Sequence, residues 1–298
     1  MESTELSTST SAARNAADQA APRSRLAVFA GDRPALLGAC FLALVILGSL
    51  AAPLVSPYDP ARGFDTLRLA PPLSPDHLLG TDVQGRDVLS RIIWGGRVSL
   101  FIALTPALLA FPVALSLGLL AGYFGQWVDQ IIMRSLDILF AFPMVLLAIA
   151  IGGALGPGLR TEILAIGIVL VPYLTRVVYS VTQTLRTTEF VDAARAVGAN
   201  DFEIVVWELM PNVVPALLIY TTSLLGRIII VAAGLSFFGL GPPPPTPDWG
   251  VMINENRAVL AQAPAASIFP GLMVALVSLA FNFIGDGLRE MLDPYRQG

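Results

Sequence analysis

Residues that could perform covalent or metal chemistry are scarce in this sequence of 298 residues. A single histidine, His77, and a single cysteine, Cys40, exclude a disulfide, a Cys–His dyad and a His/Cys zinc cluster within one copy. All 18 basic residues are arginines. A P-loop needs a lysine that reaches the terminal phosphates of the nucleotide. The chain therefore cannot be a P-loop ATPase by itself, and we expect no catalytic residue, metal or cofactor in it.

The stretch GTDVQGRD spaces its acids somewhat like a calcium loop. Asp82 and Asp87 lie five positions apart, but no bidentate glutamate follows and Arg86 lies between them. We favour a polar turn over a metal site, followed by an amphipathic helix in which Arg86 and Arg91 face water. The face turned to lipid or to other spans would hold Val88, Leu89, Ile92 and Ile93, with Trp94 at the interface.

A second polar stretch, EFVDAARAVGANDFEIVVWELMPN, covers residues 189–212 and carries five acids against one base. Its apolar residues recur at helical spacing, which predicts two short amphipathic helices. They are Phe190, Ala194 and Val197 in the first helix, and Phe202, Val205, Val206 and Leu209 in the second. An ordinary connector lying on the membrane is the simplest interpretation. Anionic lipid heads repel an acidic surface, however, so a protein partner with a complementary cleft is favoured.

The turn between these two helices has residues suited to ending one helix and beginning another. Gly198 can adopt the left-handed conformation that ends the first helix. Asn200 can cap the second helix, and Glu203, three residues on, completes a capping box. Pro211 is expected to end the second helix.

The rest of the sequence is apolar, with 55% hydrophobic and 13% charged residues and a mean hydropathy of +0.70. Such a composition is typical of a chain embedded in a bilayer. About six runs reach the length of roughly 20 apolar residues that a spanning helix needs. They cover residues 35–52, 98–122, 136–155, 161–182, 213–238 and 265–285.

Charge near the ends of the spans predicts the orientation. Four arginines precede the first span, at positions 14, 23, 25 and 33, which favours a cytoplasmic N-terminus. With six spans, the C-terminus and residues 189–212 are also cytoplasmic, whereas residues 56–97 lie outside. Residues 1–33 are predicted to form a disordered tail. A net charge of −4 suggests no nucleic-acid partner.

The segment DAARAVGANDFEIVVWELMPN resembles the coupling loop of bacterial ABC importer permeases, the "EAA" loop. Asp192, Ala193, Ala194 and Gly198 match its pattern, with Asp in place of Glu, and Pro211 keeps the later proline. In such permeases the loop docks into a groove on a separate ATP-binding subunit. The resemblance therefore implies that ATP and magnesium are bound by partner subunits and not by this chain.

Three further motifs narrow the family. HLLGTDVQGRDVLSRIIWGGRVSL, LSFFGLGPPPPTPDWG and NFIGDGLREMLDP resemble segments of the C-type permease of dipeptide, oligopeptide and nickel ABC importers. This resemblance covers about residues 33–296. In the last motif a glycine pair is expected to end the sixth span, with Asp286 and Arg289 paired. GPPPPTPDWG reads as a stiff external strap, either meeting a binding protein or simply closing a loop.

The resemblance implies an all-α integral membrane protein with type I ABC importer architecture and a cytosolic coupling helix. Its organisation would be a tail over 1–33, a first span with an external segment over 34–97, and a permease core over 98–298 with the coupling loop at 188–212. The implied function is half of a translocation pathway for di- or oligopeptides or related solutes. The implied partners are a homologous B-type permease, two ATP-binding subunits or domains and an extracytoplasmic substrate-binding protein.

Alternatives remain at this stage, namely a nickel- or haem-type importer permease, a secondary transporter and a membrane-bound enzyme. A secondary transporter would need an acid within the membrane, for which only Asp137 qualifies. Clustered catalytic polar residues are not evident in the spans, which disfavours an enzyme. Arg227 lies near the middle of the fifth span, where the resemblance supplies no arginine. A guanidinium there is expected to face the bundle, a partner acid or a water-filled path, and Arg227 is our candidate for the translocation pathway.

Overall fold

The computed structural model describes residue 29 and residues 31–292. Most of the predicted tail over 1–33 and the last six residues lie outside this part of the chain. Helices dominate it, and its only β-structure consists of isolated bridges in the segment between α4 and α5. The α-helices are α3 (Arg33–Leu50), α4 (Ala52–Val55), α5 (Val88–Phe124), α6 (Gln126–Phe140), α7 (Met144–Leu155), α8 (Leu159–Leu185), α9 (Glu189–Ala196), α10 (Asp201–Glu203), α11 (Met210–Phe237), α12 (Trp249–Asn256) and α13 (Ala265–Leu292).

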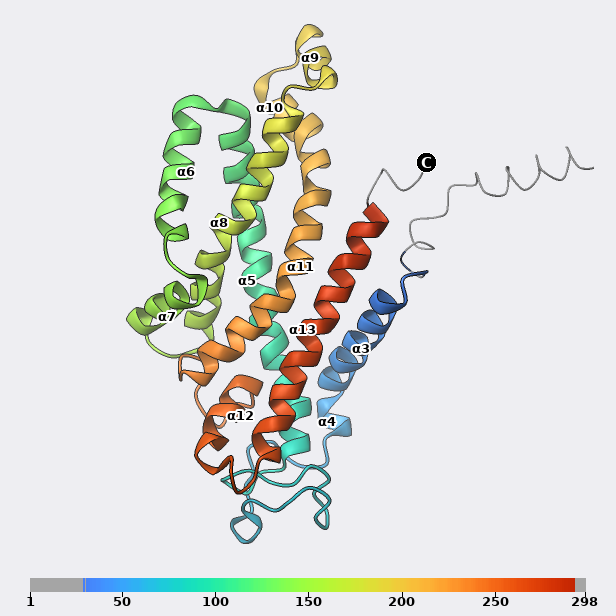
Figure 1. Ribbon diagram of the computed structural model, residues 1–298, viewed down its shortest axis with the longest axis vertical. Coiled ribbons are helices and arrows are strands. Elements are labelled where there is room, and N and C mark those ends of the chain that lie inside the picture. The colour runs from blue at the N-terminus through green and yellow to red at the C-terminus, as the bar shows by residue number, and fades with distance from the viewer. Residues whose placement is uncertain (1–28, 30, 293–298) are drawn as a thin grey trace, which may run out of the picture.

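Five helices or helix runs of the described residues are long and apolar enough to cross a membrane, and a bent pair can supply a sixth crossing. The five are α3, α5, α8, the run from α10 through α11, and α13. They lie roughly side by side along the long axis of the molecule (Figure 1). One end of this bundle carries α9 and α10, and the other carries α12 and the segment between α4 and α5. The predicted count of about six spans is confirmed.

The predicted third span is not one straight helix. α6 and α7 meet at 88°, across a break of three residues. Pro143 lies at this break, immediately before α7. Proline lacks an amide hydrogen, and it disfavours the helical conformation in the residue before it, so the chain turns here. The predicted run over 136–155 thus contains the end of α6, the bend and all of α7.

The second span is longer than its predicted range of 98–122. α5 begins at Val88 and contains 37 residues, which corresponds to about 55 Å of helix, against a hydrocarbon core of roughly 30 Å. Asp87 caps its first turn by accepting a hydrogen bond of 2.7 Å from the Ser90 amide. Pro106 and Pro112 lie within the helix without ending it. α5 is therefore longer than a straight crossing of the hydrocarbon core requires.

Close packing of α5 against α8 depends on small residues. A Cβ atom at Gly122 would lie 2.7 Å from Cβ of Thr182, and one at Gly118 would overlap the side chain of Val178. Within a bilayer, helices associate chiefly through such van der Waals fit, because lipid is as apolar as the side chains. Gly118 and Gly122, four residues apart on one face, therefore set the distance between the two central helices.

Gly285 and Gly287 near the C-terminus also allow close helix packing. The prediction that this glycine pair ends the sixth span is wrong. α13 continues to Leu292. A Cβ atom at Gly285 would lie 2.9 Å from Cα of Ser223 in α11, and one at Gly287 would overlap Ala35 of α3. The glycines thus admit close neighbours instead of breaking the helix. The ion pair predicted between Asp286 and Arg289 is also not formed in the described chain.

We predict that Gly118→Ile destabilises the helix bundle, because the new side chain has no room against α8. Overpacking of this kind lowers the free energy of unfolding by about 1–3 kcal/mol. Gly153→Ile in α7 is the matched control, since a Cβ atom there meets nothing within 4 Å. The midpoint of thermal unfolding in detergent is the measurement. Equal midpoints for the two variants would contradict the packing role of Gly118.

Candidate functional site

The coupling segment of residues 188–212 projects from one end of the helix bundle (Figure 1). α9 ends in a turn at Gly198, which has a φ of +91°. The Gly198 amide donates to the carbonyl of Arg195 at 3.0 Å, and the Ala199 amide donates to Ala194 at 3.1 Å. A Cβ atom at Gly198 would meet nothing within 4 Å, so backbone conformation and not space requires glycine here. The predicted left-handed helix end is confirmed.

The predicted capping box is also present. The Glu203 amide donates to the Asn200 side-chain oxygen at 2.9 Å, and the Asn200 amide donates to the Glu203 carboxylate at 2.9 Å. The two residues thereby satisfy each other's free amides at the start of α10. The segment is also tied to α5, because the Tyr123 hydroxyl donates to the Asp201 carboxylate at 2.6 Å.

The prediction that Pro211 ends the second helix is wrong. Residues Ile204–Leu209 form a π-helix, in which the Met210 amide donates to the carbonyl of Val205, five residues back. Helix α11 follows without a break, so that one helical run extends from Asp201 to Phe237. A π-helical turn widens the helix by one residue, and this local adjustment accommodates the proline that follows.

The apolar residues of the coupling segment divide between two faces. Val191, Ile204 and Leu209 are buried in the core of the bundle. Val197, Phe202 and Trp207 are 85%, 72% and 70% exposed, and together with Phe190 they form what we call the docking face. Phe202 and Leu209, predicted to share one face, lie on different faces because the π-helical turn shifts the spacing. Large apolar side chains exposed on a projecting, otherwise polar segment indicate a protein contact.

Some members of the coupling segment were not found by sequence reasoning. The apolar spacing selected neither Val191, which is the buried anchor of α9, nor Trp207. Asp192, Ala193 and Ala194, which carry the family resemblance, lie on α9 itself. Asp192 is exposed and accepts a hydrogen bond of 3.2 Å from Arg195, so its carboxylate is not held by the bundle.

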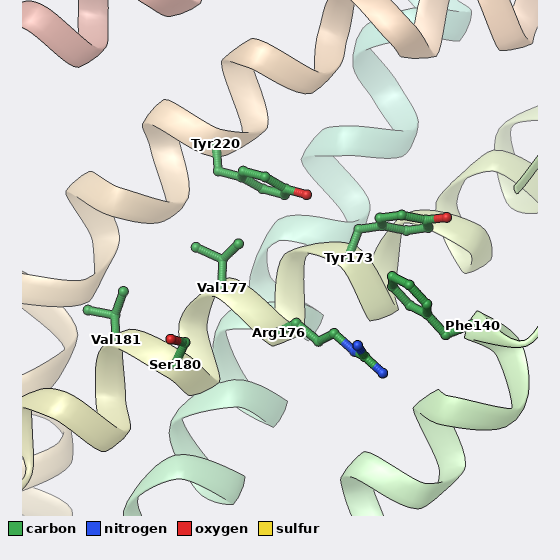
Figure 2. A pocket seen from close by; sticks show the side chains of 7 residues that line it. All are labelled: Phe140, Tyr173, Arg176, Val177, Ser180, Val181 and Tyr220. Atoms are coloured by element: carbon green, nitrogen blue, oxygen red, sulfur yellow. The ribbon is translucent and has the colours of Figure 1, made fainter.

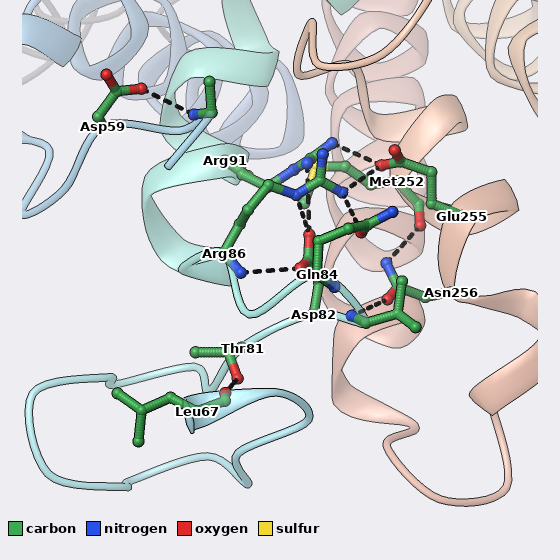
Figure 3. A network of polar contacts seen from close by, with 12 residues as sticks. Asp59, Leu67, Thr81, Asp82, Gln84, Arg86, Arg91, Met252, Glu255 and Asn256 are labelled. Carbon is green, nitrogen blue, oxygen red and sulfur yellow. Dashed lines mark hydrogen bonds and ion pairs between the residues drawn. The ribbon is translucent and has the colours of Figure 1, made fainter. Parts of the chain in front are cut away.

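At the opposite end of the bundle, charged residues are buried where exposure was expected. Arg91 is fully buried and Arg86 nearly so, which corrects the prediction that both face water. Arg86 contacts Asp82 at 2.6 Å and Glu255 at 2.7 Å, and Arg91 contacts the same two carboxylates at 3.3 and 2.8 Å. Figure 3 shows these four residues, which we call the outer cluster, joining the segment between α4 and α5, the start of α5, and α12. The partner Glu255 lies 164 positions from Arg91 in the sequence, so no local pattern could reveal it.

The outer cluster also accounts for the acids that spaced like a calcium loop. Asp82 additionally accepts hydrogen bonds of 2.9 Å from the amides of Gln84 and Arg86. Asp87 contacts Nδ1 of His77 at 2.9 Å as well as capping α5. Both carboxylates are therefore used within the fold. Among the described residues, no group of three or more His, Cys, Asp or Glu side chains could hold a metal ion.

The proline-rich strap ends in a packed corner. Asp248 caps α12 by accepting a hydrogen bond of 3.0 Å from the Val251 amide, and the Ser99 hydroxyl donates to it at 2.6 Å. Burial raises the pKa of Asp248 above its usual range, and these hydrogen bonds oppose that rise. Trp249 is fully buried, and its ring nitrogen donates to the carbonyl of Ile92 at 3.0 Å. Pro243, Pro244 and Pro245 remain exposed at the surface.

Arg227 lies on the outer surface of this chain. Its side chain is exposed on α11 and makes no hydrogen bond or ion pair with any described residue. It does not face the interior of the bundle formed by this chain. Of the three surroundings expected for Arg227, the bundle interior is excluded, which leaves a partner acid or a water-filled path.

Comparison with known proteins gives consistent results along the chain. The family model described as binding-protein-dependent transport system inner membrane component matches residues 114–297, and the N-terminal transmembrane domain of oligopeptide transport permease C matches residues 24–72. The glutathione transport system permease protein GsiD of Pectobacterium atrosepticum is 41% identical over 266 residues, covering 89% of this chain and 88% of that protein. The dipeptide transport system permease protein DppC of Alkalihalophilus pseudofirmus is 42% identical over 266 residues, covering 88% and 86%.

The fold is also found in a solved transporter. The inward-facing methionine ABC transporter MetNI has a chain that matches with a TM-score of 0.53 at 18% identity, covering 67% of this chain and 95% of that one. At this level of identity the likeness concerns the fold alone.

We predict that Glu255→Gln strongly destabilises the outer end, because it leaves two buried arginines sharing one carboxylate. Breaking a buried pair in this way costs about 3–5 kcal/mol. Asp286→Asn, which neutralises an exposed acid of α13, is the matched control. Thermal unfolding should be followed in detergent with the subunits that co-purify. An unchanged midpoint for Glu255→Gln would show that the outer cluster does not hold this end together.

Proposed function

The chain belongs to the family of binding-protein-dependent transport system inner membrane components, which are multi-pass membrane proteins, and from this premise we propose its role in transport. We propose that it is a permease subunit of an ABC importer for di- or oligopeptides. It would form half of the translocation pathway beside a homologous B-type permease. Relatives named as glutathione and dipeptide permeases support the peptide class.

The observation that carries this proposal is the docking face, formed by Phe190, Val197, Phe202 and Trp207. Large apolar side chains exposed on a projecting segment are suited to enter a cleft on another protein. We propose that this protein is one of two ATP-binding subunits, which would bind ATP and magnesium because this chain has no lysine for a P-loop. Asp192, Ala193, Ala194, Gly198, Asn200 and Glu203 would shape the segment that docks.

The helical run from Asp201 to Phe237 suggests how docking moves the gate. Its 37 residues correspond to about 55 Å of continuous helix, which starts inside the coupling segment and ends beside α12. Pro211 lies within this run and does not interrupt it. A displacement imposed on the docking face by closure of the ATP-binding subunits would therefore reach the outer end. Alternating access of the pathway would follow from this rigid transmission.

The same arrangement supports a proposed orientation. The docking face would lie in the cytosol together with both termini, and the segment between α4 and α5 would lie outside with α12. An extracytoplasmic substrate-binding protein would meet this outer end, where the prolines of the strap are exposed. Arg227 would face the pathway or an acid of the partner permease, because an exposed guanidinium within a span is costly against lipid.

We predict that Gly198→Val uncouples ATP hydrolysis from uptake while leaving the complex assembled. A φ of +91° is strained for valine, so the turn should lose at least about 1 kcal/mol and aim α10 differently. Gly48→Val in α3 is the control, because a Cβ atom there meets nothing within 4 Å. Uptake of a labelled dipeptide and ATPase activity should be measured on the same complexes. Wild-type uptake by Gly198→Val would refute the coupling role of this turn.

The proposed orientation predicts opposite labelling of two introduced cysteines in a Cys40→Ser background. Leu73→Cys in the external segment, an 80% exposed position, should react with an impermeant maleimide added outside intact cells. Thr187→Cys, exposed just before α9, should react only after the membrane is opened. Labelling of both cysteines from the same side would rule out the orientation and the cytosolic docking together.

A further inference from the structure

A pocket of about 300 Å³ opens between α6, α8 and α11, within the membrane-spanning part of the chain. Phe140, Tyr173 and Tyr220 form aromatic walls, and Arg176 lines the pocket beside them (Figure 2). The Phe140 and Tyr173 ring centroids lie 4.6 Å apart, and the Arg176 guanidinium lies 4.1 Å from the Phe140 centroid. This volume is at the lower end of the roughly 300–1,000 Å³ typical of small-molecule sites.

The charged residues at this pocket are open to their surroundings. Nη2 of Arg176 contacts Oδ1 of Asp137 at 2.5 Å, and the two side chains remain 44% and 49% exposed. Arg176 lies four residues beyond the middle of α8, which is about 6 Å along the axis. Half-exposed charges at this depth are unfavourable against lipid. This face must therefore look onto a water-filled path or a partner subunit.

Helices α6 and α8 are also joined by other contacts, so the Arg176–Asp137 pair is not needed to hold them together. The Tyr179 hydroxyl of α8 donates to the Asp129 carboxylate of α6 at 2.9 Å, and Gln183 donates to the same hydroxyl at 2.6 Å. Arg176 uses a single short contact to Asp137, and an arginine carries five N–H donors in a planar fork. The other donors make no hydrogen bond to a described residue and are available to a ligand.

We propose that this pocket is a substrate subsite that binds the free carboxylate of a short peptide through Arg176 and holds an apolar or aromatic side chain against Phe140, Tyr173 and Tyr220. Planar guanidinium donors match a carboxylate, and the aromatic faces supply apolar contact without fixing one side chain. Asp137 orients Arg176 and keeps the empty pocket neutral. This inference rests on the proposed function and gives it a chemical class of substrate, peptides with a free C-terminus.

The test compares alanyl-phenylalanine with its C-terminal amide on the intact complex. Ser180 lines the pocket and is exposed, so Ser180→Cys in a Cys40→Ser background reports occupancy through its maleimide labelling rate. The purified complex of both permeases and the ATP-binding subunits is placed in nanodiscs without binding protein or nucleotide. The concentration of each peptide that halves the labelling rate is measured. Uptake of the same dipeptide by cells is assayed separately.

In this background, the concentration that halves the labelling rate should be at least about tenfold higher for the amide than for the free acid. The amide loses a charge-assisted hydrogen bond to Arg176. Arg176→Gln combined with Asp137→Asn, which strands no charge, should abolish this difference. Arg134→Gln, an exposed arginine of α6 outside the pocket lining, should retain it. If the double variant does not assemble, Arg176→Lys decides, and it should weaken protection by the acid but not by the amide.

The outcomes separate the two proposals. The subsite proposal would be overturned if the acid and the amide halved the labelling rate at equal concentrations in the unsubstituted pocket. It would also be overturned if Arg176→Lys changed these two concentrations equally. The absence of protection in a complex that imports the dipeptide would overturn it as well. Cells that import no peptide, whether this dipeptide, glutathione or longer oligopeptides, would overturn the proposed peptide function, and the subsite with it.

Discussion

A charged group that meets neither a partner nor water is strongly disfavoured, in a protein interior as in a bilayer, and this constraint explains where two sets of ionic groups lie. At the outer end, two arginines and two carboxylates are enclosed and neutralise one another. Within the spans, Arg176 and Asp137 are paired but half open, and Arg227 is exposed without a polar partner among the described residues. The enclosed charges serve cohesion, whereas the open ones indicate which faces of the bundle lipid does not cover.

Local signals in the sequence predicted local structure well. The apolar runs located the spans, and the turn at Gly198 and the capping box of Asn200 and Glu203 formed as expected, because each depends on residues within one or two turns. The same reasoning failed where the decisive contact is distant. The local sequence around Arg91 is typical of the polar face of an interfacial helix. Its burial depends on contact with Glu255, which lies far along the chain. Pro211 looked like a stop signal because its spacing gives no indication of the π-helical turn before it.

The candidate site was predictable only in part. Family motifs located the coupling segment, but spacing alone selected neither Trp207 for the docking face nor Val191 as its buried anchor. The pocket at Arg176 was not anticipated, since its walls come from three helices separated by many residues. Asp137 was considered only as a possible ion-binding acid, and its contact with Arg176 accounts for it instead.

The π-helical turn at Ile204–Leu209 has a further consequence, for the rotational phase of the helix. One extra residue per turn rotates everything beyond it by about 100° relative to an α-helix of the same sequence. The direction in which Phe202 points is therefore set independently of the direction in which Arg227 and Tyr220 point. A permease of this fold can keep its membrane face and turn its docking face towards a differently shaped partner by gaining or losing a single residue at this turn.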